Sequence, residues 1–153
     1  MKEENAAGVV FAVLNEIGII AQLSRTVLEA RLPDELIGPH FTVLNHLVRV
    51  GDGQTPMAMA KAFQVPKTSI AHTLKVLTQR GLIEMRANPD DGRSKCVWLT
   101  DAGRALREDT ISKLGPDLAG VVQSFGIDRF VEMLPHLRAF RILLDENRDT
   151  ANN

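Results

Sequence analysis

The residue types that most often carry out catalysis are scattered through this sequence. Its 4 histidines are His40, His46, His72 and His136, and none of them falls into a metal-binding spacing such as His-Glu-x-x-His. Cys96 is the only cysteine, which excludes an intramolecular disulfide and a multi-cysteine zinc site. The sequence has neither a glycine-rich phosphate loop nor a nucleophile elbow. We therefore predict no enzyme activity, no metal and no cofactor.

A different group of polar residues is spaced for contact with nucleic acid. Lys67, Thr68, Ser69 and His72 fall in the first turns of an expected helix, and Lys75 follows one turn later. Hydroxyl, imidazole and ammonium groups can contact base edges or phosphates. The alternative for Thr68 and Ser69 is capping of the helix, and the alternative for His72 is an ordinary surface histidine.

A second basic pair lies in a stretch rich in turn-forming residues. Arg93 and Lys95 follow the acidic pair Asp90 and Asp91. We expect Asp91 to hold the Arg93 guanidinium in an extended pose without contacting DNA itself. An arginine braced in this way suits the minor groove of DNA, where the negative potential attracts it. The alternative is a charged surface turn without a partner.

Charge is distributed unevenly along the chain, although the net charge is only -1. Residues 1–54 carry 4 basic and 7 acidic side chains, residues 55–107 carry 9 and 4, and residues 108–153 carry 5 and 8. The central segment is therefore basic and the two flanks are acidic. This distribution favours phosphate contact by the centre of the chain, with an ordinary solvated surface as the alternative.

Two short helices joined by a tight turn must position the first polar group. Thr55 followed by Pro56 is a strong helix start, because the hydroxyl can accept a backbone N–H and proline fits the first helical position. The first helix is expected over 56–63 and the second over 66–80, with Gly81 as its stop. The apolar stripe of the second helix consists of Ile70, Leu74 and Leu77.

A hairpin should follow directly and carry the second basic pair. We expect strands over 82–86 and 95–99, joined by the turn-rich residues 88–92. A helix-turn-helix followed by a hairpin is a winged helix-turn-helix, whose second helix can enter the major groove of double-stranded DNA. The fold class is thus mainly α, with a small β-hairpin wing.

Longer helices are expected on both sides of this central part. Apolar spacing predicts helices over 3–32 and 41–50 before it. After it, a helix beginning at Thr100 should run to about Leu114 and be kinked or broken at Gly115-Pro116. A last helix is expected over 127–145, bent at Pro135, with a frayed tail from Asn147.

Length and composition are those of one compact unit. The 153 residues are 44% hydrophobic and 24% charged, enough for one core and short for two domains. A single cysteine suits a reducing cytoplasm. No stretch is expected to reach the roughly 20 apolar residues of a membrane span, so no membrane partner is expected.

The hairpin and its surroundings resemble the wing of the MarR family of transcriptional regulators. Residues 81–83 read Gly-Leu-Ile, residues 88–95 read Asn-Pro-Asp-Asp-Gly-Arg-Ser-Lys, and residues 99–103 read Leu-Thr-Asp-Ala-Gly. The family's wing pattern is similar: Gly-Leu, then Asp-Asp-x-Arg, then Leu-Thr-x-x-Gly. Gly92 occupies the variable position of Asp-Asp-x-Arg, where many relatives have a second arginine.

The resemblance covers the whole chain loosely and implies one subunit of a homodimer. Residues 1–35 and 108–147 would form the dimerisation helices, and residues 41–106 the DNA-binding region. The implied function is a repressor that binds a near-palindromic operator and responds to a small-molecule effector. The implied dimer contacts are apolar: Val10, Leu14, Phe130, Leu137, Phe140, Leu143 and Leu144.

The effector site is left unassigned by the sequence. Leu36, His40, Phe41 and Trp98 could line a cleft, but burial of Phe41 and Trp98 in the core is the favoured interpretation. Cys96 has no second cysteine to resolve a sulfenic acid, so a redox role is not favoured. The alternative function is a winged helix that binds protein and has no specific DNA target.

Overall fold

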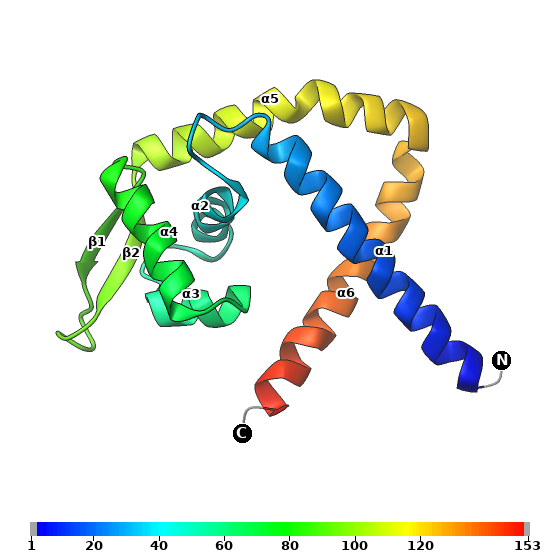
Figure 1. The fold of residues 1–153 in the computed structure, drawn as a ribbon, viewed down its shortest axis with the longest axis horizontal. Coiled ribbons are helices and arrows are strands. Elements are labelled where there is room, and N and C mark those ends of the chain that lie inside the picture. The colour runs from blue at the N-terminus through cyan, green and yellow to red at the C-terminus, as the bar shows by residue number, and fades with distance from the viewer. Residues whose placement is uncertain (1–2, 152–153) are drawn as a thin grey trace. The chain divides into compact units, whose positions relative to one another are not determined.

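The structure, a computed structural model, describes the backbone of residues 3–151 and the side chains of residues 5–148. Figure 1 labels its elements along the chain. They are α1 (Glu3–Glu29), α2 (Gly38–Val50), α3 (Pro56–Phe63), α4 (Lys67–Gln79), β1 (Ile83–Ala87), β2 (Lys95–Leu99), α5 (Asp101–Phe125) and α6 (Ile127–Ala151). This is the winged helix-turn-helix architecture expected from the sequence.

The chain does not form the single compact unit expected from its length. It divides into two units, one ending at Leu114 and the other beginning at Gly115. The first unit contains α1 to β2 and the start of α5. The second contains the rest of α5 and α6, and in it Phe125 packs edge-on against Phe130 with ring centroids 5.1 Å apart.

The helix-turn-helix forms where its start and stop signals predict. The Thr55 hydroxyl accepts the backbone N–H of Ala58 at 3.1 Å and so caps α3. Gln64 ends α3 in the left-handed region, with φ of 54°. Gly81 follows α4 with φ of 68°, a conformation that glycine adopts without strain.

The wing is an antiparallel two-stranded hairpin with one isolated β-bridge at its edge. Its register runs from Ile83 opposite Leu99 to Ala87 opposite Lys95. Gln54 bridges to Val97 and accepts its N–H at 2.8 Å. Asp52 Oδ1 accepts the Leu99 N–H at 2.8 Å. These bonds fasten the α2–α3 loop to β2, a link that the sequence did not suggest.

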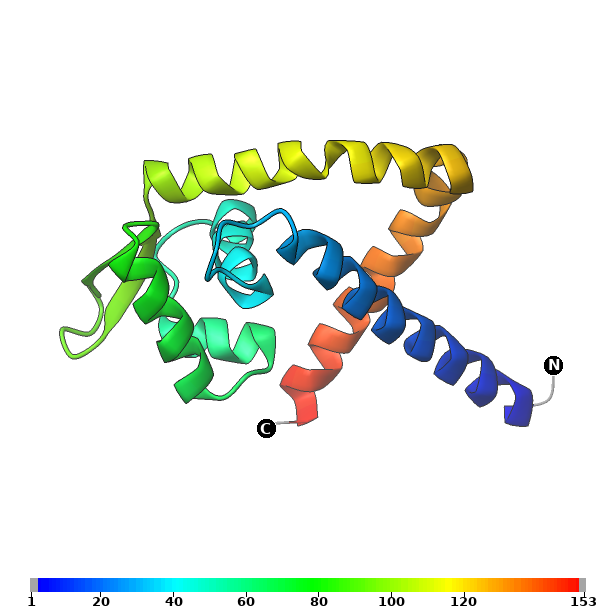
Figure 2. The ribbon, with the colours of Figure 1, turned by 45° about the horizontal axis from the view of Figure 1, so that its top comes forward.

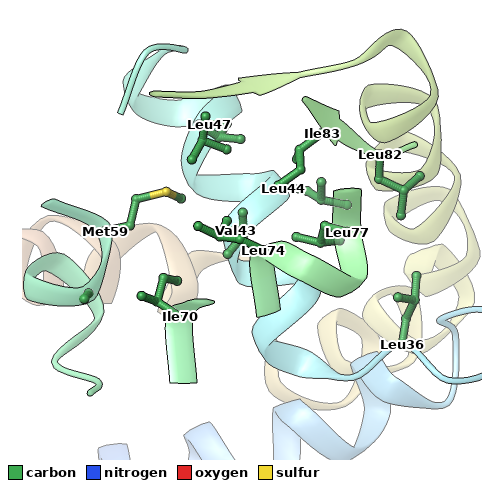
Figure 3. Packing of buried hydrophobic residues seen from close by; sticks show 12 residues of the cluster. Leu36, Val43, Leu44, Leu47, Met59, Ile70, Leu74, Leu77, Leu82 and Ile83 are labelled. Atoms are coloured by element: carbon green, nitrogen blue, oxygen red, sulfur yellow. The ribbon is translucent and has the colours of Figure 1, made fainter. Parts of the chain in front are cut away.

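The core lies between α2, α3, α4 and the wing. Figure 3 shows its side chains converging from α2, α4 and β1. The predicted stripe of α4 is buried, whereas Phe41 and Val48 on α2 are only half-buried. The cluster comprises Leu36, Val43, Leu44, Leu47, Met59, Ala60, Ile70, Leu74, Leu77, Leu82, Ile83 and Val97.

The start of α5 explains the Leu-Thr-x-x-Gly part of the wing pattern. Thr100 donates its hydroxyl to the Gly81 carbonyl at 2.7 Å and accepts the Gly103 N–H at 3.0 Å. A Cβ on Gly103 would lie 2.0 Å from the Leu82 carbonyl oxygen. Only glycine allows α5 to pass so close to the chain that enters the wing.

Both prolines expected to interrupt the C-terminal helices lie inside continuous helices. α5 runs through Pro116 to Phe125, and α6 runs through Pro135 to Ala151. The expected break at Gly115-Pro116 is therefore wrong, and so is the frayed tail from Asn147 as far as Ala151; the rest of that tail lies outside the described residues. A proline removes one N–H and crowds one carbonyl, which a long helix can absorb through its remaining bonds.

Helix α1 corrects the expectation that no segment is long enough for a membrane. By length and composition, Asn5–Glu29 could cross one, and none of it is buried. Polar residues such as Asn15 and Glu16 interrupt the apolar run in the sequence, but they are few enough that the helix as a whole is strongly apolar.

Candidate nucleic-acid interface

The outer face of α4 carries the polar set predicted from the sequence. Its five members are all exposed, while the inner stripe of α4 is buried in the core. They are Lys67, Thr68, Ser69, His72 and Lys75. Pro66 is the N-cap of α4, and no side chain caps this helix end. The capping alternative for Thr68 and Ser69 is thus wrong, and their hydroxyls remain available to a partner.

The tip of the wing is held by short-range hydrogen bonds. Asn88 donates its side-chain amide to Ser94 Oγ at 2.9 Å and accepts the Asp90 N–H at 3.0 Å. The Ser94 N–H donates to the Asp91 carbonyl at 3.1 Å. In Figures 1 and 2 this turn projects at the end of the hairpin, and Arg93 and Lys95 are exposed on it.

Asp91 acts on Arg93 differently from what we expected. Its Oδ1 accepts the backbone N–H of Arg93 at 3.0 Å. Among the described residues, no ion pair joins Asp91 to the Arg93 guanidinium. Asp91 therefore shapes the turn from which the guanidinium projects, and it does not brace the guanidinium itself.

Behind α4, His40 is buried near the outer polar set. Its Nδ1 accepts the Ile37 N–H at 3.0 Å, at the start of α2. Burial, and next the nearby His72 and Arg80, lower the pKa of His40 below its usual value of 6.5. The neutral form fits this geometry, because a protonated Nδ1 could not accept the bond.

Further polar contacts tie the α1–α2 loop to the end of α4. Arg80 donates to the Asp34 carbonyl at 2.9 Å and to Glu35 Oε2 at 2.5 Å. Glu35 has φ of 71°, in the left-handed region. Glu29 Oε1 accepts the Gly38 N–H at 2.7 Å and so joins α1 to α2. The C-terminal end of α4 is thus attached to the loop that leads from α1.

The four residues considered for an effector cleft have different environments. Leu36 and His40 are buried, while Phe41 and Trp98 are half-buried and do not join the core cluster. The favoured burial of Phe41 and Trp98 is therefore wrong. Cys96 is buried on β2, as expected for a small apolar residue.

Sequence reasoning missed one ordered arginine of the wing. The Arg86 guanidinium lies over the Trp98 ring, 4.1 Å from its centroid. The sequence could have indicated this contact, because alternate residues of a strand share a face. Glu84 and Arg86 therefore lie on one face of β1, together with Trp98, the cross-strand partner of Glu84.

A buried helix-turn-helix core, an exposed polar helix face and a projecting wing define a winged helix-turn-helix protein. Residues 35–94 match the family model of the MarR family. The resemblance inferred from the wing is therefore confirmed over this segment.

Solved structures of MarR and of another transcriptional regulator have a similar fold. MarR of E. coli in its apo form is 24% identical, with a TM-score of 0.70 over 82% of this chain and 94% of that one. A MarR variant of E. coli solved with operator DNA is 23% identical, with a TM-score of 0.68 over 86% and 94%. BldR of Sulfolobus solfataricus is 18% identical, with a TM-score of 0.70 over 91% and 99%.

Proposed function

We propose that this protein is a cytoplasmic transcriptional repressor that binds a near-palindromic DNA operator as a homodimer. The observation that carries the proposal is the uncapped, exposed start of α4, with two lysines, two hydroxyls and a histidine on one face. The positive end of the helix dipole adds to their attraction for DNA. The crystal structure of a protein with a similar fold, a MarR variant in complex with operator DNA, supports the same conclusion.

The two contact regions have different roles in this proposal. α4 enters the major groove, where Ser69 and His72 read base edges and Lys67 and Lys75 contact phosphate. The turn shaped by Asp91 places Arg93 in the minor groove, with Lys95 beside it. Loss of Lys67 should weaken binding to all sequences, whereas loss of His72 should reduce the preference for the operator.

The test is binding to a labelled duplex from upstream of the protein's own gene, measured over a salt series. Arg93→Ala should weaken operator binding, and Lys67→Ala should lower the salt slope by about 1. Lys113→Ala is the charge-matched control, because Lys113 is outside the proposed DNA-contacting set and pairs with Asp109 along α5. Sedimentation should first show that this variant keeps the association state of the wild type. Weak, sequence-independent binding by the wild type would favour a protein-binding winged helix.

The proposed dimer interface consists of the flanking segments 1–35 and 108–147. The implied contacts Val10 and Leu14 on α1 and Leu143 and Leu144 on α6 are exposed in the single chain. Each large apolar side chain gains about 1.5–3 kcal/mol when it is buried, so a second copy would stabilise these faces. The two flanks are acidic, which keeps them away from DNA.

Analytical ultracentrifugation without detergent tests the dimer. We expect a dimer for the wild type and a monomer or aggregate when the first 30 residues are removed; a soluble monomer that binds DNA would refute the dimer. Ile20→Asp, on the exposed face of α1, should favour the monomer without deleting the helix. Flotation of the wild type with lipid vesicles would instead assign α1 to a membrane.

An effector is proposed to weaken DNA binding by favouring a second arrangement of the dimer. An apolar hollow of about 390 Å³ beside α4 is one place for a small molecule. Its walls include Pro56, Ala71, Leu74, Lys75 and Met85. Apolar compounds that release the duplex from the wild type, but not from a Met85→Trp variant, would support this location.

A further inference from the structure

Arg86 is an ordered cation of the wing that the DNA-contacting set above leaves out. It lies near the end of β1, and its side chain is 53% exposed. Its Nε donates to Glu84 Oε1 at 2.6 Å, and an Nη also pairs with that carboxylate. The Trp98 ring supports the guanidinium from below. The guanidinium is thus held in one orientation at the surface.

Strand pairing places this group on the outer face of the wing. Glu84 is paired with Trp98 and Arg86 with Cys96, so the four side chains share a face. Ile83 and Met85 belong to the other face of β1, where Ile83 is part of the core and Met85 packs against it. Arg86 therefore faces away from α4, close to the turn that carries Arg93.

The tryptophan platform is itself anchored. Gly53 lies against the ring, since a Cβ there would be 3.9 Å from Trp98 Cζ2. The Gly53 N–H donates to the Val97 carbonyl at 2.9 Å, and Asp52 holds the Leu99 N–H. The residues on both sides of Trp98 are therefore bonded to the α2–α3 loop. A planar guanidinium on a fixed ring loses little further entropy when it binds an anion.

The surrounding charges select the kind of anion. A hollow of about 340 Å³ opens beside Arg86, and Asp90 and Trp98 are among its walls. Glu84 and Asp90 together outweigh one arginine, so a free phosphate ion would not be held here. Arg86 could still hold a phosphate that other contacts of the protein have already positioned. Arginine has five hydrogen-bond donors, and Glu84 does not use them all.

We propose that Arg86 binds a backbone phosphate of the DNA duplex beside the groove entered by the wing tip. The proposal rests on the proposed function, since α4 and the tip must first place the duplex. It adds a second arginine contact to the wing. At the tip, Gly92 stands where many relatives have an arginine, so Arg93 is the arginine of the tip. The contact is to phosphate, so it strengthens binding without selecting sequence.

The test measures binding of the full-length protein to operator and unrelated duplexes over a salt series. Arg86→Ala should weaken both about tenfold, the loss of one charged hydrogen-bonding contact, and lower the salt slope by about 1. Arg86→Lys should keep the slope and recover part of the affinity. Lys113→Ala, once sedimentation shows that it keeps the association state of the wild type, should change neither affinity nor slope. An unchanged slope in Arg86→Ala would overturn the proposal.

The single tryptophan provides a second readout that is independent of affinity. Duplex binding should draw the guanidinium toward the phosphate and change Trp98 emission in the wild type. At saturating duplex, Arg86→Ala should lose that change, and inorganic phosphate should cause none in either protein. An equal emission change in both proteins would overturn the proposal. Failure of the wild type to bind any duplex would instead refute the proposed function.

Discussion

In the winged region, Leu44 and Leu77 have no exposed surface, whereas Phe11 and Leu23 on α1 are 71% and 63% exposed. The first pair belongs to a core that one chain completes with its own α2, α3, α4 and wing. The second pair belongs to a helix whose large apolar side chains are exposed. The difference indicates that contacts within the winged region bury its own core, while the apolar side chains of α1 gain little burial from that core.

Gly103 should be the most sensitive position of the winged region. Gly103→Ala places a methyl group against the Leu82 backbone, so α5 must separate from the wing. We expect a loss of about 4 kcal/mol of unfolding free energy, measured by urea denaturation followed by circular dichroism. Gly115→Ala is the control, since its Cβ meets nothing within 4 Å and alanine favours the helix. Equal stability of the two variants would show that the close approach at Gly103 does not matter.

A pair of leucine truncations tests the comparison directly. Leu44→Ala should cost about 3 kcal/mol, because it leaves a cavity in a closed core. Leu23→Ala on α1 should change the unfolding of the dissociated chain by less than about 0.5 kcal/mol. Its effect should appear as weaker self-association in sedimentation at several concentrations. A large loss of stability in the dissociated Leu23→Ala chain would mean that α1 is part of the same core.

His40 should make the winged region sensitive to acid. Because its folded-state pKa lies below 6.5, the unfolded chain binds the proton more readily. The contribution of neutral His40 is therefore complete above pH 6.5 and is lost as the pH falls through the folded-state pKa. Thermal melts at several pH values should show this decline.

Two substitutions of His40 separate its hydrogen bond from its titration. His40→Ala should cost about 1 kcal/mol at pH 7.5, the value of a lost cap. His40→Gln should keep the bond to the Ile37 N–H, since glutamine serves at this position of a capping box, and should flatten the acid decline. His46 is a second group with a pKa lowered by burial and by Arg49, so some decline should remain.

The smallest effect is expected on α6. Arg141 donates to Asp145 Oδ2 at 3.0 Å, and both side chains are about half exposed. Asp145→Asn should change the unfolding free energy by no more than about 0.5 kcal/mol, because water and salt screen such pairs. The same melts would measure it. A change above 1 kcal/mol would indicate that this face of α6 is buried in the assembled protein.

The parts of the fold that depend on local signals were predictable from the sequence. Thr55 with Pro56 and Gly81 mark helix ends through their own backbone preferences, so α3, α4 and the hairpin lie within a residue or two of their predicted bounds. The expected break at Pro116 failed because the local cost of proline is smaller than the gain from continuing a long helix.

The site was predictable in its residue types and less so in its contacts. Exposure of Lys67 and His72 follows from the period of α4, as does burial of Ile70. The bond from Asp91 to a backbone N–H depends on the exact turn, and the stack of Arg86 on Trp98 depends on strand register. Neither contact can be predicted from residue spacing within one segment. The first depends on the backbone conformation of the turn, and the second on which residue of β2 lies opposite β1.

The bonds between the α2–α3 loop and β2 also have a consequence for the order in which a growing chain folds. Asp52 is synthesised 47 residues before Leu99, the residue whose N–H it accepts. Until β2 has left the ribosome, Gln54 has no strand to pair with, and the loop before the helix-turn-helix lacks its bonds to the wing. The α2–α3 loop can thus be fastened only after β2 has been synthesised. A chain truncated between β1 and β2 would leave β1 without its partner strand, and an unpaired strand is prone to aggregation.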